Sequence, residues 1–473
     1  MSNGENRGAW GSKIGFVLAA AGSAIGLGNI WKFPYICGEN GGGAFVLIYL
    51  VCIVVVGLPI MIGEIMIGRS TQKSPVGAFE DLGGKRSRWK IVGGMGVFAA
   101  FVMLSYYSIV AGWACHYTWL SISGEISGGD PKEVGAVFGN LYENTNANLG
   151  WHVFFMALTA LVVLGGIQRG IERGARILMP LLLVMLSVLL VQATRQSGWD
   201  KALQFVFEPN TDNLTAEGIL EALGHSFFTL SLGVGAMITY GSYLRKDSCL
   251  VSNSVAICVL DTVIALMACL ILFPITFSFG MTPTAGPGLV FQNIPVALAQ
   301  MPGSQFLCIV FFSLLVFAAL TSSISLLEVV ASYFIDQKKW SRKKATLVCT
   351  AAITLFGIPS ALSGGTDLFG ANFASAKESI LGEEWGAITK GNWFDFADYV
   401  VSNWMLPLSG MLIAVFCAWR LGEKVRRDEF VRSSTLGHLY AAWLRLLQYV
   451  VPAIILVVLL HSTGVLKALG ILD

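Results

Sequence analysis

The stretch Ala19–Pro34, AAAGSAIGLGNIWKFP, places three glycines within seven residues inside a segment apolar enough to cross a membrane. Glycine weakens a helix interior, so the pattern predicts a membrane helix that is interrupted near its middle. Backbone groups freed at this depth are tolerated only where protein or a water-filled cavity satisfies them. Freed carbonyl oxygens could bind a hard cation, and freed N–H groups at a helix N-terminus could bind a carboxylate.

A second glycine-rich stretch, Ser231–Ala236 (SLGVGA), lies in another apolar segment, and polar side chains accompany both stretches. The side-chain oxygens that could join a cation or substrate site belong to Asn29, Tyr107, Thr229 and the run Leu320–Ser323 (LTSS). Two plainer alternatives remain open. The glycines could let helices pack closely, and a single serine or threonine could bond back to its own helix.

The composition places these stretches in a membrane protein. Hydrophobic residues make up 55% of the chain and charged residues 13%, with a mean hydropathy of +0.68, which is more apolar surface than a soluble fold could bury. The net charge of +2 gives no reason to expect a nucleic acid partner. The nine cysteines are scattered and the five histidines dispersed, which argues against a disulfide framework, a metal centre and an enzyme.

Eleven apolar segments are long enough to span a membrane, for which about 20 residues are needed. Their expected limits are 13–36, 42–68, 91–122, 151–168, 175–194, 220–243, 250–279, 305–335, 345–362, 395–419 and 446–464. Lysine and arginine concentrate after the even-numbered spans, whereas the segment 124–150 after span 3 contains only Lys132. The positive-inside rule therefore predicts a cytoplasmic N-terminus and, with eleven spans, an outer C-terminus.

The two glycine-rich spans are five spans apart, so a second copy of a five-span unit would begin with the opposite topology. This pattern is typical of an inverted repeat whose discontinuous helices form a site at the bilayer midplane. We predict an all-α integral membrane fold with a 5+5 inverted repeat, broken helices 1 and 6, and one extra helix. The expected division is a cytoplasmic segment 1–12, a first repeat 13–195, an extracellular connection 196–219, a second repeat 220–420, and a cytoplasmic loop with helix 11 in 421–473.

Four motifs resemble the neurotransmitter:sodium symporter family. Ala19–Pro34 and the following Glu39–Phe45 (ENGGGAF) resemble its first two helices, Phe227–Tyr243 (FFTLSLGVGAMITYGSY) its sixth, and Ala318–Ser325 (AALTSSIS) its eighth. With eleven spans, the chain is similar to the bacterial amino-acid transporters of that family, of the leucine-transporter type. The resemblance implies sodium-coupled transport by alternating access. The segment 364–392 is longer than in that branch, and no function is assigned to it.

The resemblance also implies two sodium sites. The first would use the Ala24 carbonyl, Asn29, Thr229 and Asp261, together with the carboxylate of the substrate. The second would use the carbonyls of Gly22, Ile25 and Ala318 and the hydroxyls of Thr321 and Ser322.

A substrate pocket between the broken helices is implied in the same way. Its expected lining is Ser23, Ala24, Gly28, Met103, Tyr107, Phe228, Thr229, Ser231, Val234, Ser322 and Leu326. Tyr107 would bind a substrate carboxylate, and Phe228 would cover the substrate. Family members that carry monoamines have an aspartate where this chain has Gly26, so the glycine leaves room for the carboxylate of an amino acid. Because no charged side chain lines the expected pocket, we expect a neutral substrate with a hydrophobic or aromatic side chain.

Chloride is expected to be dispensable. Chloride-dependent members have a glutamine and a serine around the anion, where this chain has His225 and Ala265. Asp261 stands where others have an asparagine near the first sodium ion. A carboxylate inside a membrane is costly and is a functional candidate by default. We expect Asp261 to be a fixed charge that replaces chloride; the alternative is a protonated, hydrogen-bonded structural aspartate.

Charged and aromatic side chains are expected to close the path on both sides. Lys32 and Asp398 would form the outer gate, and Arg7, Asp336, Trp10 and Tyr243 the inner gate. The alternatives are that Lys32 snorkels to the membrane interface and that Arg7 is an ordinary positive-inside charge. Glu64 in span 2 is expected to be neutral or paired within the bundle, with no direct role in transport.

The sequence thus predicts a sodium-coupled amino-acid symporter in a bacterial inner membrane. One alternative is a proton-coupled carrier of related architecture, which would be expected to lack the hydroxyl pair Thr321/Ser322 or to replace the second sodium ion with a basic side chain; neither is found. The other is an amino-acid receptor that does not transport. The sequence leaves open which amino acid is bound, the ion stoichiometry, proton counter-transport and the oligomeric state.

Overall fold

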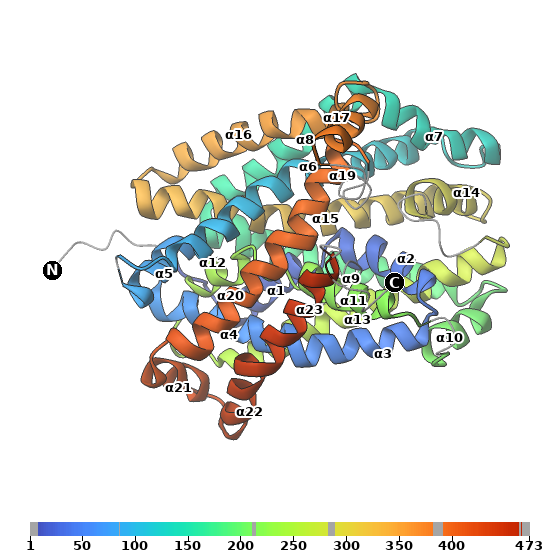
Figure 1. Cartoon of the computed structure of the whole chain (residues 1–473). Helices are drawn as coiled ribbons and strands as arrows, with labels where there is room; N and C mark the ends of the chain where they lie inside the picture. The colour runs from blue at the N-terminus through green and yellow to red at the C-terminus, as the bar shows by residue number, and fades with distance from the viewer. Residues whose placement is uncertain are drawn as a thin grey trace.

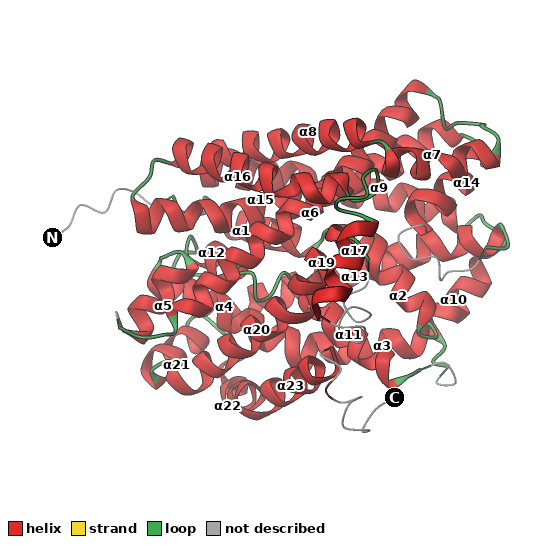
Figure 2. Ribbon diagram, turned by 45° about the horizontal axis from the view of Figure 1, so that its top comes forward, coloured by secondary structure: helices red, strands yellow, loops and turns green. Residues whose placement is uncertain are grey.

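The computed structural model describes residues 8–84, 86–210, 214–281, 289–381, 391–462 and 465. Within these ranges every regular element is a helix (Figure 2), and β pairing is limited to one isolated bridge between Gly42 and Pro209. The expected all-α architecture is therefore confirmed for the described part of the chain. Arg7, which was expected at the inner gate, lies outside it.

The first part of the chain runs to the segment that was expected to connect the two repeats. Its helices are α1 (Lys13–Ala24), α2 (Phe33–Glu39), α3 (Gly43–Cys52), α4 (Leu58–Thr71), α5 (Pro75–Gly83), α6 (Lys90–Ser123), α7 (Pro131–Glu143), α8 (Thr145–Leu164), α9 (Arg173–Ala193) and α10 (Trp199–Phe207). Wider π-helical turns at Gly28–Lys32, Ile53–Gly57 and Ile167–Glu172 lead into α2, α4 and α9.

In the second part, too, every regular element of the described residues is a helix. Its helices are α11 (Ala216–Thr229), α12 (Ala236–Gly241), α13 (Leu250–Ser278), α14 (Ile294–Ala299), α15 (Ser304–Lys338), α16 (Arg342–Leu362), α17 (Ala371–Leu381), α19 (Trp393–Tyr399), α20 (Leu406–Val415), α21 (Glu423–Val431), α22 (Tyr440–Arg445) and α23 (Val451–Ser462). Its π-helical turns are Leu289–Asn293, Val400–Met405, Phe416–Arg420 and Leu446–Val450, and Gly437–Leu439 is a short 3₁₀ helix.

Fewer than eleven of the described helices satisfy the length of a membrane span. Nine are long and apolar enough, and α1 with α2 forms a tenth span that bends by 51° at its break. The segment 220–243, expected as the broken span 6, is divided into α11 of 14 residues and α12 of 6 residues. Neither piece alone reaches the roughly 20 residues that a span needs. Both glycine-rich segments are therefore interrupted.

Two long helices, α6 and α15, pack against each other in the middle of the bundle. They have 34 and 35 residues, so each is about 50 Å long at ~1.5 Å per residue. Their most apolar windows are 72% buried, whereas those of the spans Ile167–Ala193 and Gly437–His461 are only 28% buried. The broken helices are thus supported by a rigid interior, while the peripheral spans expose apolar side chains as membrane helices do.

The short helices between spans gather at two opposite ends of the molecule. Figure 1 shows α5 and α21 at the left end and α7, α10 and α14 at the right end. The first two follow spans 2 and 10 and the other three follow spans 3, 5 and 7 of the sequence prediction. Elements that were expected on the same side of the membrane therefore lie on the same side of the fold.

Candidate functional site

The first helix begins with a cap and ends at its glycine-rich break. The Ser12 side chain accepts a hydrogen bond from the Gly15 N–H, which starts α1 at Lys13. After Ala24 the backbone of Ile25 is extended, with φ −76° and ψ 92°. The chain becomes helical again at Gly28. The carbonyls at the end of α1 are therefore released from regular helical bonding at the centre of the bundle.

The second break lies between α11 and α12, at Leu230–Gly235. Residues of other helices hold its backbone in position. Ser231, Gly233 and Gly235 take left-handed φ angles of 52°, 83° and 76°. A Cβ on Gly233 would stand 2.6 Å from the Leu406 carbonyl oxygen, so only glycine fits there. The buried Glu64 carboxylate accepts a hydrogen bond from the Gly233 N–H at 2.7 Å. Glu64 was given no role by the sequence, yet it holds the unwound part of the second broken helix.

Asp261 of α13 is fully buried and lies where the two breaks meet. Its carboxylate accepts hydrogen bonds from the Asn29 amide at 2.7 Å, the Thr229 hydroxyl at 2.9 Å and the Tyr49 hydroxyl at 3.1 Å. No lysine or arginine of the described residues forms an ion pair with it. A buried carboxylate without a basic partner is costly unless it takes up a proton or a cation binds beside it. Three of the four residues predicted for the first sodium site are thus in direct contact.

A second set of oxygens lies between α1 and α15. The Thr321 hydroxyl is 3.0 Å from the Ala318 carbonyl oxygen and 3.5 Å from that of Ile25. The Ser322 hydroxyl is 3.5 Å from the Gly22 carbonyl oxygen. Oxygens spaced in this way can surround a hard cation held at about 2.3–2.6 Å. All five residues predicted for the second sodium site therefore converge, and every oxygen among them is uncharged.

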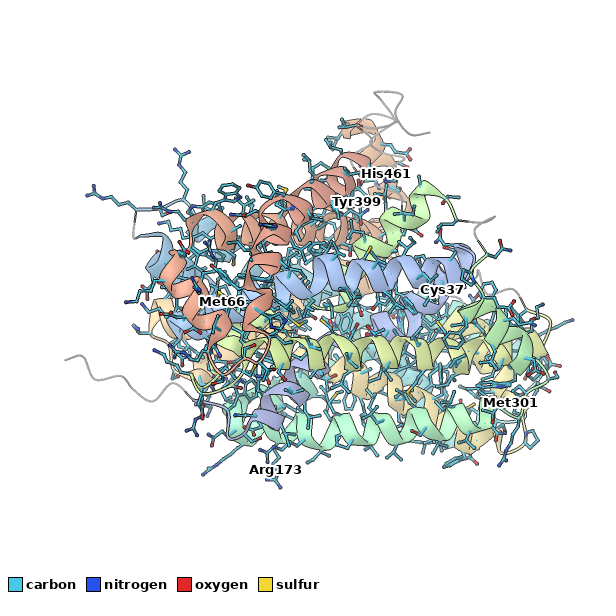
Figure 3. The ribbon with its side chains drawn as sticks, turned by 90° about the horizontal axis from the view of Figure 1, so that it is seen from below. Cys37, Met66, Arg173, Met301, Tyr399 and His461 are labelled. Carbon is cyan, nitrogen blue, oxygen red and sulfur yellow. The ribbon has the colours of Figure 1, made fainter. Side chains whose placement is uncertain are left out.

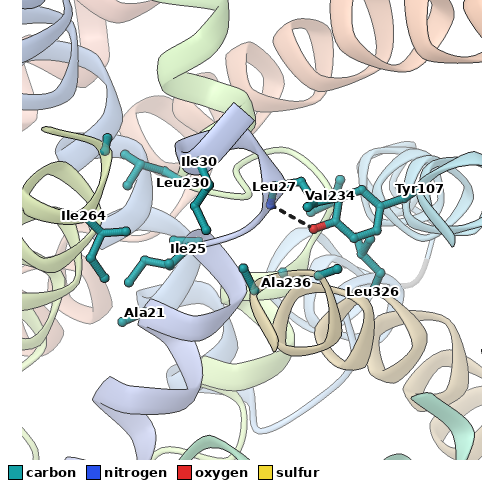
Figure 4. Close-up of a cluster of buried hydrophobic side chains, with 14 of the residues drawn as sticks. Ala21, Ile25, Leu27, Ile30, Tyr107, Leu230, Val234, Ala236, Ile264 and Leu326 are labelled. Atoms are coloured by element: carbon teal, nitrogen blue, oxygen red, sulfur yellow. Dashed lines mark hydrogen bonds between the residues drawn. The ribbon is translucent and has the colours of Figure 1, made fainter. Parts of the chain in front are cut away.

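A small central cavity of about 20 Å³ borders both oxygen clusters, since Thr229 and Ser322 are in its lining. It is lined by Ser23, Ala24, Gly26, Gly28, Met103, Tyr107, Phe228, Thr229, Ser231, Ser322 and Leu326. Ten of the eleven residues predicted for the substrate pocket are in this lining. The exception is Val234, which is buried in the apolar cluster drawn with Tyr107 and Leu326 in Figure 4. The cavity holds little more than one water molecule, so an amino acid would require its walls to move apart.

The carboxylate end of the cavity is defined by Gly26, Leu27 and Tyr107. The Tyr107 hydroxyl accepts a hydrogen bond from the Leu27 N–H at 3.2 Å, which Figure 4 shows as a dashed line. A Cβ on Gly26 would stand 2.6 Å from the Ser322 hydroxyl and 3.0 Å from that of Tyr107. Any side chain at position 26 would therefore occupy the space between the two hydroxyls.

The two residues of the predicted outer gate do not form an ion pair within 4 Å. The Lys32 ammonium group lies 4.7 Å from the centre of the Phe228 ring, and the Asp398 carboxylate accepts a hydrogen bond from Ser402. The cation–π contact places the lysine directly above the aromatic side chain that was expected to cover the substrate.

Trp10 and Tyr243 of the predicted inner gate belong to a hydrogen-bond network that includes residues outside the prediction. The Trp10 indole donates to the Tyr240 carbonyl at 2.9 Å, and the Trp10 N–H donates to the Tyr243 carbonyl at 3.1 Å. The Tyr243 hydroxyl donates to Glu328 at 2.7 Å, and Glu328 also forms a two-bond ion pair with Arg342. Asp336 accepts a hydrogen bond from the Ser74 N–H at 2.6 Å.

His225 and Ala265, at the positions of the chloride ligands in other members, are both buried. Neither ring nitrogen of His225 has a hydrogen-bond partner among the described residues. The rings of Phe33, Tyr49 and Phe228 surround the imidazole instead.

Sequence reasoning did not identify Tyr49, Glu328, Arg342 or Ser325 as parts of this region. Glu328 carried a usable signal, because an acidic residue within a long apolar span is a functional candidate by default. Tyr49 and Ser325 carried none. Their roles depend on contacts with Asp261 and Ser23, which are distant in the sequence.

Comparison with known proteins agrees with this geometry. Residues 7–132 and 142–381 match the model of the sodium:neurotransmitter symporter family. The chain is 38% identical over 97% of its length, and 98% of the relative's length, to the sodium-dependent transporter YhdH of Bacillus subtilis. It is 33% identical to the sodium-dependent transporter MJ1319 of Methanocaldococcus jannaschii, over 98% of this chain and 92% of the relative.

Among solved structures, the fold is similar to that of MhsT, determined in complex with L-phenylalanine. The TM-score is 0.86 with 41% sequence identity, and the match covers 96% of this chain and all of the MhsT chain. The family match covers well over half of the sequence, and the relatives agree with it along nearly its whole length. The chain therefore belongs to the sodium:neurotransmitter symporter family, as a sodium-dependent, multi-pass membrane transporter and not an enzyme.

Proposed function

We propose that this protein carries a neutral amino acid with a hydrophobic or aromatic side chain into the cell together with two sodium ions. The observation that carries the proposal is Asp261, a buried carboxylate that two broken helices and α3 surround with hydrogen-bond donors but that no basic side chain of the described residues neutralises. A sodium ion beside Asp261 would supply the missing charge. The similarity to MhsT, a protein solved with L-phenylalanine, supports the choice of substrate class.

The substrate would lie in the central cavity with its carboxylate toward Gly26 and Tyr107. The absence of a side chain at Gly26 leaves this end free for the carboxylate, which would also complete the coordination of the first sodium ion. Met103, Phe228 and Leu326 would contact the side chain of the substrate, and Met103 can repack around substrates of different shape. Asp261 would make chloride unnecessary by supplying a permanent negative charge.

The eleven-span arrangement would place this site at the midplane. The interrupted pairs α1–α2 and α11–α12 would be spans 1 and 6 of two inverted five-helix repeats, 13–195 and 220–420, with helix 11 added. The residues 1–12 and the end with α5 and α21 would be cytoplasmic, and the C-terminus would be outside, in a bacterial inner membrane. Lys32 with Asp398 would close the outer side, and Arg7, Trp10, Tyr243 and Asp336 the inner side.

The expected driving force is large. Moving one charge through 100 mV yields about 2.3 kcal/mol, so two sodium ions would contribute roughly 4.6 kcal/mol. This corresponds to about three decades of substrate accumulation at about 1.4 kcal/mol per decade. The sodium concentration gradient would add to this amount.

The first test is uptake of a mixture of the twenty amino acids into proteoliposomes, read by mass spectrometry. We expect accumulation of one or a few hydrophobic or aromatic amino acids with an inward sodium gradient, and none in sodium-free buffer. Uptake driven by a pH gradient without sodium would instead establish a proton-coupled carrier. Binding of sodium and an amino acid without accumulation would establish a receptor.

Two further conditions test the finer parts of the proposal. Replacing chloride by gluconate should leave uptake unchanged, because Asp261 supplies the charge. Tyrosine should compete for uptake and tyramine should not, because tyramine lacks the carboxylate that Gly26 admits. Equal competition by both compounds would contradict the assignment of the carboxylate end.

A further inference from the structure

A hollow of about 570 Å³ opens on the surface between α9 and the beginning of α15, away from the central cavity. On the α9 side it is lined by Val184, Val188 and Val191, which are 58%, 36% and 55% exposed. Phe306 on α15 is 58% exposed and forms part of the opposite wall. In a protein that crosses a bilayer, side chains of this kind face the lipid.

The hollow is apolar along its length and polar at one end. Ser187 donates its hydroxyl to the Leu183 carbonyl of its own helix at 2.8 Å, so it offers the hollow no free donor. The ten residue steps from Leu183 to Ala193 rise about 15 Å at ~1.5 Å per residue. This is half of a hydrocarbon core about 30 Å thick, which is the depth of a single leaflet. Gln192 and Arg195 lie at the end of this rise.

Arg195 places a positive charge at the polar end. Its side chain is exposed, and no ion pair between described residues includes it. Figure 3 shows α9 running from Arg173 at one side of the molecule toward Met301 at the other. Met301 immediately precedes Pro302 and Gly303, which line the hollow together with Arg195. In the proposed orientation this is the outer side of the membrane.

We propose that this hollow is a binding site for one anionic phospholipid of the outer leaflet. An acyl chain would lie against Val184, Val188 and Phe306, and the phosphate would contact Arg195 and Gln192. The bound lipid would bridge α9 to α15, the helix that carries Thr321 and Ser322. One basic side chain near an anionic lipid strengthens binding about fivefold, so the headgroup supplies the preference for negative charge.

The test is native mass spectrometry of the full-length protein titrated with phosphatidylglycerol or with phosphatidylcholine carrying the same acyl chains. We expect one phosphatidylglycerol molecule to bind with about fivefold preference. Arg195→Gln should remove the preference, and Val188→Trp, which fills the hollow, should weaken binding of both lipids. Two matched controls lie on exposed surface outside the hollow: Lys201→Gln removes another cation, and Leu161→Trp adds another tryptophan to a lipid-facing helix. Both controls should bind lipid as the wild type does.

Three results would overturn the proposal. The first is equal retention of both lipids that Arg195→Gln does not change. The second is binding of inorganic phosphate alone that abolishes the binding of phosphatidylglycerol in the same titration. This result would mean that no acyl chain is needed for binding. The third is a dimer in detergent that Val188→Trp dissociates, because a second copy of the chain would then cover this surface.

Discussion

The two oxygen clusters of the site differ in charge: one contains a carboxylate and the other contains only neutral oxygens. The cluster around Asp261 has a full negative charge at its centre, and donors from three other elements, Asn29, Tyr49 and Thr229, converge on that one carboxylate. The cluster around Thr321 and Ser322 has only hydroxyl and carbonyl oxygens, contributed by two helices, α1 and α15. If both clusters bind sodium as proposed, the first would attract the ion through charge, and the second only through the number and spacing of its dipoles.

This difference suggests different parts in a transport cycle. Four elements hold the charged cluster, so its geometry survives small movements of any one of them. The neutral cluster exists only while α1 and α15 are in contact, because its oxygens are divided between these two helices. Separation of the two helices would disperse the neutral cluster before the charged one.

Removing the negative charge of Asp261 while keeping the shape of its side chain should have the largest effect on uptake. We expect Asp261→Asn to lower sodium-dependent uptake in chloride-free buffer by at least about hundredfold, the scale of breaking a buried charge pair. The measurement is initial uptake into proteoliposomes with gluconate as the anion. Asp81→Asn is the control, because Asp81 is exposed and pairs with Lys73 at the surface. Recovery of Asp261→Asn by added chloride would support the role of the charge, and full activity without chloride would refute it.

Removing one neutral ligand should have a smaller effect that appears in sodium affinity. Thr321→Ala deletes a hydroxyl that lies between the Ile25 and Ala318 carbonyls. We expect the sodium concentration for half-maximal uptake to rise about thirtyfold, the equivalent of about 2 kcal/mol for a lost buried polar partner. Thr321→Ser keeps the hydroxyl and should remain within about threefold of the wild type. Identical behaviour of the alanine and serine variants would show that this hydroxyl is not a ligand.

Removing one hydrogen bond to the Asp261 carboxylate, without removing its charge, should raise the sodium requirement by a smaller factor. Tyr49→Phe deletes one of three donors to Asp261 and leaves the ring packing intact. We expect the same sodium concentration to rise about tenfold, near the lower end of the range for a hydrogen bond to a charged group. Tyr449→Phe, which changes a tyrosine that is 61% exposed, is the control and should have no effect. A loss as severe as that of Asp261→Asn would mean that the carboxylate depends on Tyr49 more than on its other two partners.

The smallest effect is expected from a link between the two helices of the neutral cluster. Ser23 and Ser325 are joined by a hydrogen bond of 2.7 Å across the boundary of α1 and α15. Ser325→Ala should raise the sodium requirement about fivefold, since a neutral hydrogen bond contributes about 1 kcal/mol. Ser375→Ala on α17, whose hydroxyl bonds only within its own helix, should be silent. If Ser325→Ala changed uptake without changing the sodium dependence, the link would belong to the substrate pocket and not to the cation cluster.

The pocket residues that the sequence predicted from short, continuous motifs lie together in the structure. Ten of the eleven expected pocket residues line one cavity because they come from a few stretches with fixed local spacing. The prediction was less complete where two distant segments must meet. Lys32 and Asp398 are not in direct contact, and Glu328 pairs with Arg342 at the inner end, where the prediction had named neither.

Apolar periodicity and glycine placement determined that the chain is a bundle of membrane helices with two interruptions, because these are local properties of hydrophobicity and backbone freedom. The tertiary structure alone decided what the interruptions face. It placed Glu64 against the Gly233 N–H, Tyr49 against Asp261, and α9 beside the start of α15 to form the lipid-facing hollow. Such contacts depend on the relative positions of helices, which are set by the packing of the whole bundle rather than by any one segment.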